Sequence, residues 1–273
     1  MADLSPLQQR VVSAAVLLPV AVAAVWLGGW AYAGMVVAAG AVIAWEWARM
    51  VYGRAWGVEM AVLAGAAVST GVAAMIVPVS YVFVLATVFW AAAVAIAVVA
   101  RRDLIWRLLA TPYICLPIVA LVLLRRDTDL GLAAILWLFC VIWATDICAY
   151  FTGRTLGGPK LAPRASPNKT WSGLAGGIAG AAAVGVATAM VLGQGNVVAL
   201  AAFSGALAVA GQGGDIAESA IKRRFGVKDS SNLIPGHGGV MDRVDGLVAA
   251  AVVAFAVGWL RGGQSAAHGA LVW

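Results

Sequence analysis

Residues 130–152 read LGLAAILWLFCVIWATDICAYFT, an unbroken apolar run that contains one acidic residue, Asp146. About 20 residues of this kind are enough for a helix to cross the hydrocarbon core of a bilayer. The rest of the chain has the same character, because hydrophobic residues occupy 63% of its 273 positions and charged residues only 11%. Soluble domains are about 25% charged. The sequence therefore predicts an integral membrane protein.

Apolar runs alternate with short polar connections along the whole chain. We place spans near residues 11–28, 30–47, 58–77, 80–100, 104–124, 130–152, 172–193, 196–214 and 244–262. The run after Arg10 has no clear cleavage site, so we interpret it as the first span and not as a signal peptide. The predicted fold is an all-α, polytopic bundle of about nine transmembrane helices, followed by a frayed polar tail that contains His268.

The seventh span is rich in glycine, with Gly173, Gly176, Gly177 and Gly180 close together. Small residues at this spacing let helices approach each other closely in lipid. We therefore expect these glycines to serve helix packing.

Lysine and arginine are divided unevenly between the two sides of the predicted bundle. With a cytosolic N-terminus, three fall outside (Arg125, Arg126, Arg261) and fifteen inside (Arg10, Arg49, Arg54, Arg101, Arg102, Arg107, Arg154, Lys160, Arg164, Lys169, Lys222, Arg223, Arg224, Lys228, Arg243). This asymmetry follows the positive-inside rule. We expect a multi-pass protein of the plasma (inner) membrane with its N-terminus and polar loops in the cytosol. The net charge of +6 then reflects topology and attraction to membrane lipids, and we expect no nucleic-acid partner.

Polar residues gather in two segments of the predicted cytosolic side, 153–171 and 215–243. We therefore divide the chain into five N-terminal spans (1–128) and a C-terminal catalytic region (129–273). Asp146, Asp215 and Asp245 lie within or at the edge of apolar spans, where a charge is costly, so each is a candidate functional residue. A structural ion pair with a nearby arginine is the alternative for any one of them.

The second polar segment shows a helical spacing at its start. Asp215, Glu218, Ser219 and Lys222 fall at i, i+3, i+4 and i+7, on one face of a helix that leaves the eighth span. The alternative for Glu218 and Lys222 is an i,i+4 pair that only stabilises the helix end. At the other end of the segment, Asp242 and Asp245 are three residues apart and face one point at the start of the ninth span.

Between these acids, residues 228–239 read KDSSNLIPGHGG. Pro235 and the three glycines predict a compact turn whose backbone N–H groups hold phosphate. Nearby cations favour a polyphosphate ligand: Lys222, Arg223, Arg224, Lys228 and Arg243. We expect His237 to order the turn or to donate to a phosphate oxygen. Oxygen ligands without a Cys or His cluster favour a hard cation such as Mg²⁺.

The first polar segment contains SPNKTW at residues 166–171. Ser166, Lys169 and Thr170 offer hydrogen-bond donors just before the seventh span. Trp171 is interpreted as an interfacial anchor, with stacking on a nucleotide base as the alternative.

Residues 219–245 read SAIKRRFGVKDSSNLIPGHGGVMDRVD. This stretch resembles the signature of the phosphatidate cytidylyltransferases, or CDP-diglyceride synthases. The 166–171 loop and the segment with Asp146 and Tyr150 are also similar to this family, so the likeness covers roughly residues 143–246. In the N-terminal half only hydropathy and small features such as Arg10 and Glu46 agree. Asn168 departs from the basic residue that many relatives have there.

The resemblance implies that phosphatidate and CTP react to CDP-diacylglycerol and pyrophosphate. It implies that Asp215 and Asp242 hold Mg²⁺, with a second cation such as K⁺ nearby, and that the protein is a homodimer. It also implies phosphate contacts from Lys222, Arg223, Lys228 and Arg243.

The residues selected from their pattern and those that the resemblance implies together form three groups of expected site residues. The metal ligands are Asp146, Asp215 and Asp242; the catalytic residues are Asp215, Lys222, Asp242 and Asp245. The substrate-binding residues are Ser166, Lys169, Thr170, Ser219, Arg223, Lys228, Asp229, His237, Gly238, Gly239 and Arg243.

The chemistry of the reaction agrees with these residue types. A phosphate monoester is mostly dianionic at neutral pH, since its second pKa is about 6. It needs no general base, only relief from repulsion by the triphosphate, which metal ions and Lys or Arg provide. The rival interpretations are a transporter or ion pathway and another enzyme acting on lipid phosphates, such as a polyprenol kinase. Few polar groups lie outside, and no Walker-type lysine loop is present, which disfavours both.

Overall fold

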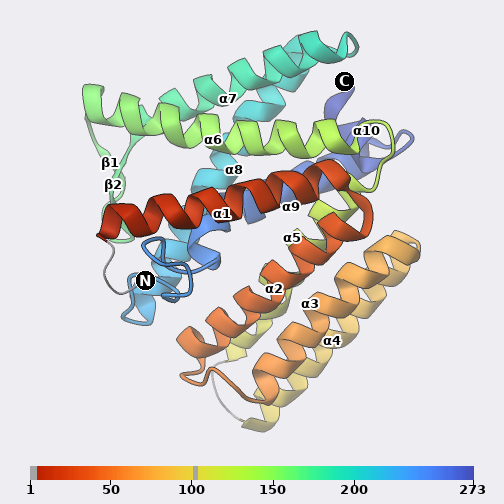
Figure 1. Cartoon of the computed structure of the whole chain (residues 1–273), viewed down its shortest axis with the longest axis vertical. Helices are drawn as coiled ribbons and strands as arrows, with labels where there is room; N and C mark the ends of the chain where they lie inside the picture. The colour runs from red at the N-terminus through yellow and green to blue at the C-terminus, as the bar shows by residue number, and fades with distance from the viewer. Residues whose placement is uncertain (1–4, 101–103) are drawn as a thin grey trace. The chain divides into compact units, whose positions relative to one another are not determined.

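The computed structural model describes residues 5–100 and 104–273, so the predicted cytosolic Arg101 and Arg102 lie outside the described residues. The described part of the chain is almost entirely helical, with one short hairpin (Figure 1). The elements are α1 (Pro6–Leu27), α2 (Gly29–Val51), α3 (Val58–Ile76), α4 (Val79–Ala100), α5 (Leu104–Arg125), α6 (Gly131–Leu156), β1 (Lys160–Ala162), β2 (Ser166–Thr170), α7 (Trp171–Leu192), α8 (Val197–Arg224), α9 (Met241–Arg261) and α10 (Ala266–Leu271).

Nine helices of the described part, α1 to α9, are long and apolar enough to cross a membrane. This confirms the predicted polytopic all-α fold. Several helices extend a few residues beyond the predicted spans. Helix α8 continues to Arg224, as the helical spacing from Asp215 to Lys222 predicts, and α9 begins at Met241. The irregular part of the second polar segment is therefore limited to residues 225–240, which we name the signature loop.

The predicted frayed tail is wrong. Residues after the ninth span form the short helix α10, whose start is capped because the Ser265 side chain accepts a hydrogen bond from the backbone N–H of His268. Ala266, Ala267 and Leu271 are buried. Burial of these small and apolar residues stabilises a segment that its composition predicted to be polar and frayed.

By packing, the chain forms two compact units, which are described separately here. The first unit comprises residues 1–122 and 225–244, and the second comprises residues 123–224 and 245–273. The signature loop therefore belongs to the unit of the N-terminal helices. The functional division predicted at residue 128 concerns catalysis and stays a prediction.

In the first unit, helices α4 and α5 are joined by a tryptophan that compensates for a proline. Pro112 lies inside α5 and has no N–H, which leaves the carbonyl of Leu108 without its helical partner. Trp90 Nε1 of α4 donates to this carbonyl oxygen at 2.9 Å. A backbone acceptor is thus satisfied inside the membrane, where no water replaces the missing donor.

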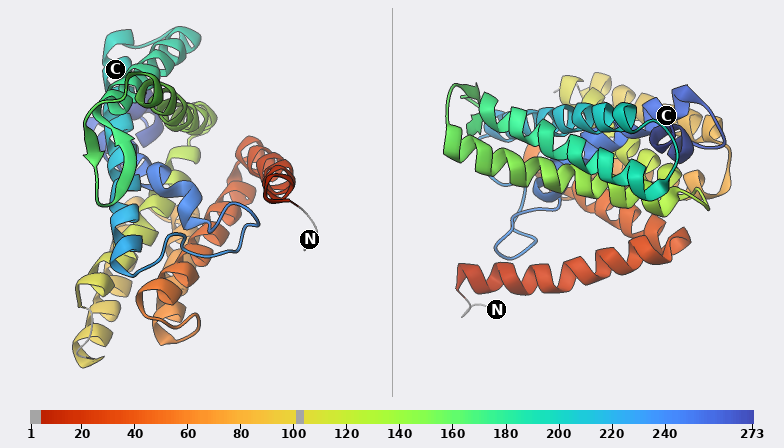
Figure 2. Two further views of the ribbon diagram at one scale, coloured as in Figure 1. Left: turned by 90° about the vertical axis from the view of Figure 1, so that its left-hand side faces the viewer. Right: turned by 90° about the horizontal axis from the view of Figure 1, so that it is seen from above.

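In the second unit, α6 and α7 lie side by side, and the β1–β2 hairpin connects them at one end (Figures 1 and 2). The glycines of α7 allow the close approach: a Cβ on Gly180 would lie 2.5 Å from Cys148 Sγ, and one on Gly177 would lie 3.1 Å from Thr145 Cγ2. This confirms the packing role predicted for these residues. The strands are antiparallel, with Lys160 opposite Thr170.

Helix α7 begins directly after β2. The Thr170 side chain caps it by accepting a hydrogen bond from the backbone N–H of Gly173 at 3.1 Å. The polar residues of β2 are therefore fixed at the end of a membrane-spanning helix, next to α6.

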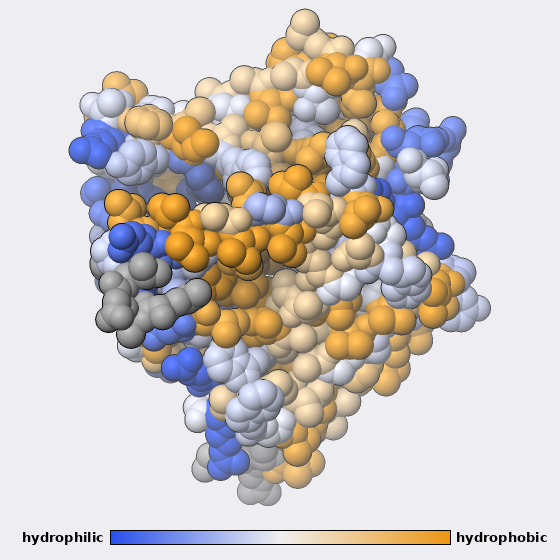
Figure 3. Space-filling model, viewed as in Figure 1, coloured by the Kyte–Doolittle hydropathy of each residue, from blue (hydrophilic) through white to orange (hydrophobic). Residues whose placement is uncertain are grey.

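The surface of α1 has the character of a lipid-facing helix. Figure 3 shows hydrophobic side chains along it, and Val16, Val20 and Trp26 are exposed. Such exposure is favourable in lipid and unfavourable in water.

Candidate active site

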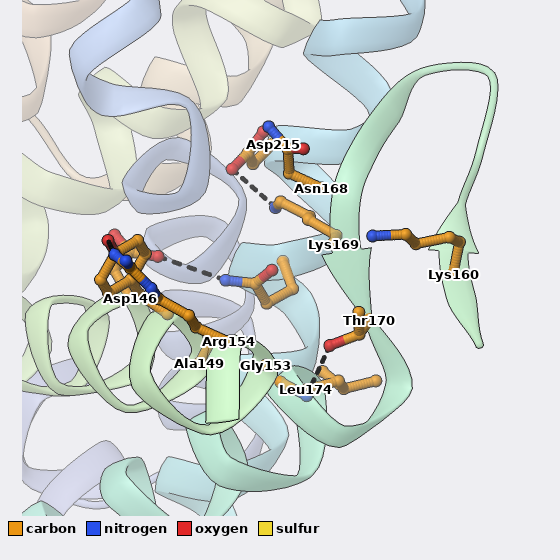
Figure 4. A pocket seen from close by; sticks show the side chains of 13 residues that line it. Asp146, Ala149, Gly153, Arg154, Lys160, Asn168, Lys169, Thr170, Leu174 and Asp215 are labelled. Atoms are coloured by element: carbon orange, nitrogen blue, oxygen red, sulfur yellow. Dashed lines mark hydrogen bonds and ion pairs between the residues drawn. The ribbon is translucent and has the colours of Figure 1, made fainter. Parts of the chain in front are cut away.

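A cavity of about 530 Å³ opens in the second unit among α6, the hairpin, α7 and α8 (Figure 4). This volume is within the range that small-molecule ligands occupy. The residues that line the cavity are Asp146, Ala149, Tyr150, Gly153, Arg154, Lys160, Asn168, Lys169, Thr170, Gly173, Leu174, Gln212 and Asp215. Four predicted site residues, Asp146, Lys169, Thr170 and Asp215, are therefore brought together.

Two carboxylates from different helices share this cavity, each with a neighbour that fixes its orientation. Gln212 Nε2 donates to Asp146 Oδ1 at 3.2 Å, and Lys169 Nζ lies 2.6 Å from Asp215 Oδ2 (Figure 4). Ser219 Oγ donates to Asp215 Oδ1 at 3.4 Å. A carboxylate has about four acceptor sites, so both acids keep capacity for a ligand.

Three cations line the same cavity. Lys169 is paired with Asp215, whereas Arg154 Nη1 donates to the hydroxyl of Tyr150 at 2.7 Å and lies over its ring. Neither Arg154 nor Lys160 has an acidic partner among the described residues. Unpaired cations beside two acids suit a ligand that carries several negative charges and a metal ion.

At the end of α8, Lys222 Nζ lies 2.9 Å from Glu218 Oε1, and Glu218 is fully buried. The helix-stabilising pair, weighed as the alternative for these residues, is therefore formed. The next residue of α8, Arg223, is exposed. Asp245 lies in α9 and accepts a hydrogen bond from the backbone N–H of Gly246 at 2.8 Å. The catalytic roles of Lys222 and Asp245 stay predictions.

Ser166 is the predicted substrate-binding residue of the hairpin that does not line the cavity. It begins β2 opposite Ala162 and is only partly exposed. Asn168, which departs from the family pattern, does line the cavity.

In the first unit, Asp242 organises the signature loop. Its Oδ2 accepts hydrogen bonds from Ser230 N at 2.9 Å, Ser230 Oγ at 2.9 Å and Gly239 N at 2.8 Å. All three donors lie in the loop, so the carboxylate ties both ends of the loop to the start of α9. Its predicted role as a metal ligand stays a prediction.

The glycines of the loop are required by its geometry. Gly238 has a φ of +83°, in the left-handed region that favours glycine. A Cβ on Gly239 would clash with Ser230 Oγ and Glu46 Oε1. The backbone N–H of Gly238 donates to the Ile234 carbonyl and that of Gly239 to Asp242, so both predicted phosphate donors are used within the first unit.

The remaining predicted residues of the loop face outward or lack partners. Lys228, Asp229 and Arg243 are exposed, and no ion pair involving them is formed within the described residues. His237 Nδ1 is buried without a hydrogen-bond partner in the described part of the chain. These side chains keep their capacity to bind a ligand.

Glu46 of α2 was missed as a site residue. It is fully buried and accepts hydrogen bonds from Ser231 Oγ at 2.6 Å, Val240 N at 2.9 Å and Met241 N at 2.7 Å. An acid inside a predicted span is itself a signal. Applied to residues 30–47, the rule that selected Asp146 would have selected Glu46 too.

Helix α1 also reaches the signature loop within the first unit. Arg10 Nε donates to the carbonyl of Gly236 at 3.0 Å, and Ser13 Oγ donates to that of Pro235 at 2.9 Å. The left view of Figure 2 shows the loop beside α1.

A dense metal cluster is not found within residues 5–100 and 104–273: no three His, Cys, Asp or Glu side chains gather there in a metal-holding arrangement. Asp146 and Asp215 in the second unit remain two acids of the same cavity. Mg²⁺ commonly uses only one or two carboxylates and takes its other ligands from substrate phosphates and water. The donor set of the cavity fits that pattern.

Comparisons with known proteins agree with the resemblance noted in the sequence. A model of the cytidylyltransferase family matches residues 8–260. Among curated proteins, the phosphatidate cytidylyltransferase of Brucella suis is 38% identical over 271 residues, which cover 93% of this chain and 94% of that protein. That of Pseudomonas aeruginosa is 38% identical over 273 residues, covering 94% and 98%. That of Haemophilus influenzae is 43% identical over 130 residues, covering 46% and 45%. The chain belongs to the cytidylyltransferase family.

Proposed function

We propose that this protein transfers the cytidylyl group of CTP to phosphatidate, which yields CDP-diacylglycerol and pyrophosphate. The relatives that match almost the whole chain are phosphatidate cytidylyltransferases. The observation that carries the proposal is the cavity of the second unit, where two carboxylates and three cations lie between membrane-spanning helices. A polyphosphate and a lipid phosphate need such charges at the edge of a membrane.

In the proposed reaction, an oxygen of the phosphatidate phosphate attacks the α-phosphorus of CTP. A new P–O bond forms, the bond from the α-phosphorus to the oxygen that bridges to the β-phosphate breaks, and pyrophosphate leaves with that oxygen. Arg154, Lys160 and Lys169 reduce the repulsion between the two anionic reactants and stabilise the negative charge on the leaving group. No residue has to remove a proton, because the attacking phosphate is already ionised.

We further propose that Asp146 and Asp215 hold Mg²⁺ together with phosphate oxygens, with a second cation such as K⁺ nearby. When bound, Mg²⁺ supplies Lewis-acid stabilisation of the phosphate oxygens. Gln212 and Lys169 orient the two carboxylates through the contacts at 3.2 Å and 2.6 Å. In the first unit, Lys228 and Arg243 are proposed as exposed phosphate contacts.

The uneven distribution of Lys and Arg supports an orientation with the N-terminus and both polar segments in the cytosol. A location in the plasma membrane is part of the proposal. CTP then reaches the polar segments directly from the cytosol. A homodimer is part of the proposal through the family resemblance.

The test uses the purified full chain in detergent, with phosphatidate and CTP labelled at either its α- or its γ-phosphate. We expect the α-label to enter the lipid and the γ-label to leave as pyrophosphate, and we expect both to stop when EDTA removes divalent cations. Transfer of the γ-label to the lipid would identify a kinase instead. Absence of label transfer from folded protein, with CTP, UTP and ATP alike, would overturn the proposal.

A further inference from the structure

Glu46 lies inside the membrane-spanning helix α2, and its side chain is fully buried. An acid at such a position is costly unless its oxygens are satisfied. Its three partners are donors that lie between 185 and 195 residues further along the chain, and none of them comes from a neighbouring turn of α2.

Two of these donors are backbone N–H groups at the start of α9. Helix α9 begins at Met241, and the first N–H groups of a helix have no partner within it. Glu46 Oε1 accepts from Val240 N and Glu46 Oε2 from Met241 N. The side chain of α2 therefore caps α9, in place of the Ser, Thr or Asp that usually does so from the preceding residue.

The third donor ties the same carboxylate to the far part of the loop. Ser231 Oγ donates to Glu46 Oε1 at 2.6 Å, and the neighbouring Ser230 donates to Asp242. Glu46 and Asp242 thus hold the two ends of the segment from Ser231 to Gly239, which carries His237 and begins three residues after Lys228.

We propose that Glu46 is a positioning residue that fixes the signature loop for binding the triphosphate of CTP. This inference rests on the proposed cytidylyl transfer. Because Glu46 is fully buried, it acts through Ser231 and the start of α9 and not by direct contact with the substrate. The N-terminal helices then take part in substrate binding as well as in membrane anchoring.

Glu46→Gln tests this with a minimal change. Two carboxylate oxygens serve three donors, and an amide replaces one of those oxygens with an NH₂ group. Whichever way the amide is turned, at least one donor then faces another donor. The matched control is Glu59→Gln, which changes an acid of the first unit whose partner is Arg107 of α5, at 3.2 Å, without touching the signature loop.

We expect Glu46→Gln to raise the KM for CTP about 10-fold, as loss of a buried charged hydrogen bond does. The KM for phosphatidate should stay within about 2-fold, because the lost contact orders a loop assigned to the nucleotide. Ser231→Ala should have a smaller effect, and the double variant should resemble Glu46→Gln alone, since both changes break one network. Glu59→Gln should leave both KM values near those of the wild type.

Hydrogen exchange of the loop gives a readout that does not depend on activity. Glu46→Gln should speed exchange in residues 228–241 and leave α6 to α8 unchanged. An unchanged KM for CTP with unchanged loop exchange would overturn the inference, as would equal effects of Glu46→Gln and Glu59→Gln on both readouts. An inactive wild type would instead overturn the proposed function, and loop exchange would still decide whether Glu46 holds the loop.

Discussion

In the cavity of the second unit, Arg154 and Lys160 have no acidic partner among the described residues. In the signature loop of the first unit, Asp242 already accepts hydrogen bonds from Ser230 and Gly239. Asp242 is 7% exposed and Ser230 is 5% exposed. The cavity therefore keeps Arg154 and Lys160 available for a ligand, whereas the buried polar groups of the loop hold the loop's own conformation. The two candidate regions thus differ: two cations of the cavity have no acidic partner among the described residues, whereas Asp242 holds the signature loop through hydrogen bonds.

The largest effects that test this comparison are expected from Asp215 of the cavity and Asp242 of the signature loop. Asp215→Asn should lower kcat/KM on the order of 100-fold or more, because it removes a cavity charge, while the melting temperature stays within about 2 °C. Asp242→Asn should also lower activity, on the order of 10-fold to 100-fold, but with a fall of about 5 °C, because its amide cannot accept from all the loop donors. Parallel assays of activity and thermal unfolding check this. Equal losses of melting temperature in the two variants would break the comparison.

A smaller effect, on the KM for CTP, is expected from Lys160 of the hairpin. Lys160→Ala should raise the KM for CTP about 5-fold without a change in melting temperature, because the ammonium has no partner in the described structure to lose. The effect should shrink at high salt, since exposed charges are screened. Arg164→Ala is the matched control, because Arg164 lies in the same hairpin but does not line the cavity. If Arg164→Ala raises the KM for CTP as much, the effect of Lys160 comes from the positive charge of the hairpin and not from its place in the cavity.

The smallest effect concerns Asp127, a carboxylate outside both regions that is held by hydrogen bonds as Asp242 is. Burial alone would raise its pKa, but hydrogen bonds from Ser265 and from the backbone of Leu130, Asp129 and Gly131 outweigh burial and lower the pKa below its usual value. A lowered folded-state pKa adds stability above the unfolded pKa of about 3.9, and this stability is lost as the pH falls through the folded value.

Asp127→Asn should therefore lower the melting temperature by about 1–2 °C at pH 6 and by less near pH 3. Activity should be unchanged. A loss of activity at full stability would show that hydrogen-bonded carboxylates of this protein do more than hold loops.

The membrane-spanning helices could be predicted from the sequence because each apolar run is long enough to cross a bilayer. The exact ends of α8 and α9 could not, since polar residues lower the hydropathy while the helix continues. Only the spacing of Asp215, Glu218 and Lys222 indicated that α8 extends past the apolar run. The β1–β2 hairpin was missed for a related reason: strands of three and five residues carry too little periodicity to be recognised.

For the site, the sequence indicated candidate residues and the local pair of Glu218 and Lys222, but not the contacts between residues far apart in the chain. The grouping of Asp146 with Asp215 and Lys169 follows from the packing of α6, α8 and the hairpin, which no local pattern encodes. The contacts of Glu46 depend on residues 185 positions away. Only its acidic character inside an apolar span was visible in advance.

That separation has a consequence for biosynthesis. Glu46 enters the membrane well before Ser231 has been translated, since 185 residues separate them. At about 5–20 residues per second, the ribosome needs roughly 10–40 s to make this stretch. Throughout that time, the three residues that donate hydrogen bonds to Glu46 of α2 have not yet been translated. The hydrogen bonds that satisfy Glu46 in the first unit can therefore form only after residues 231–241 have been made.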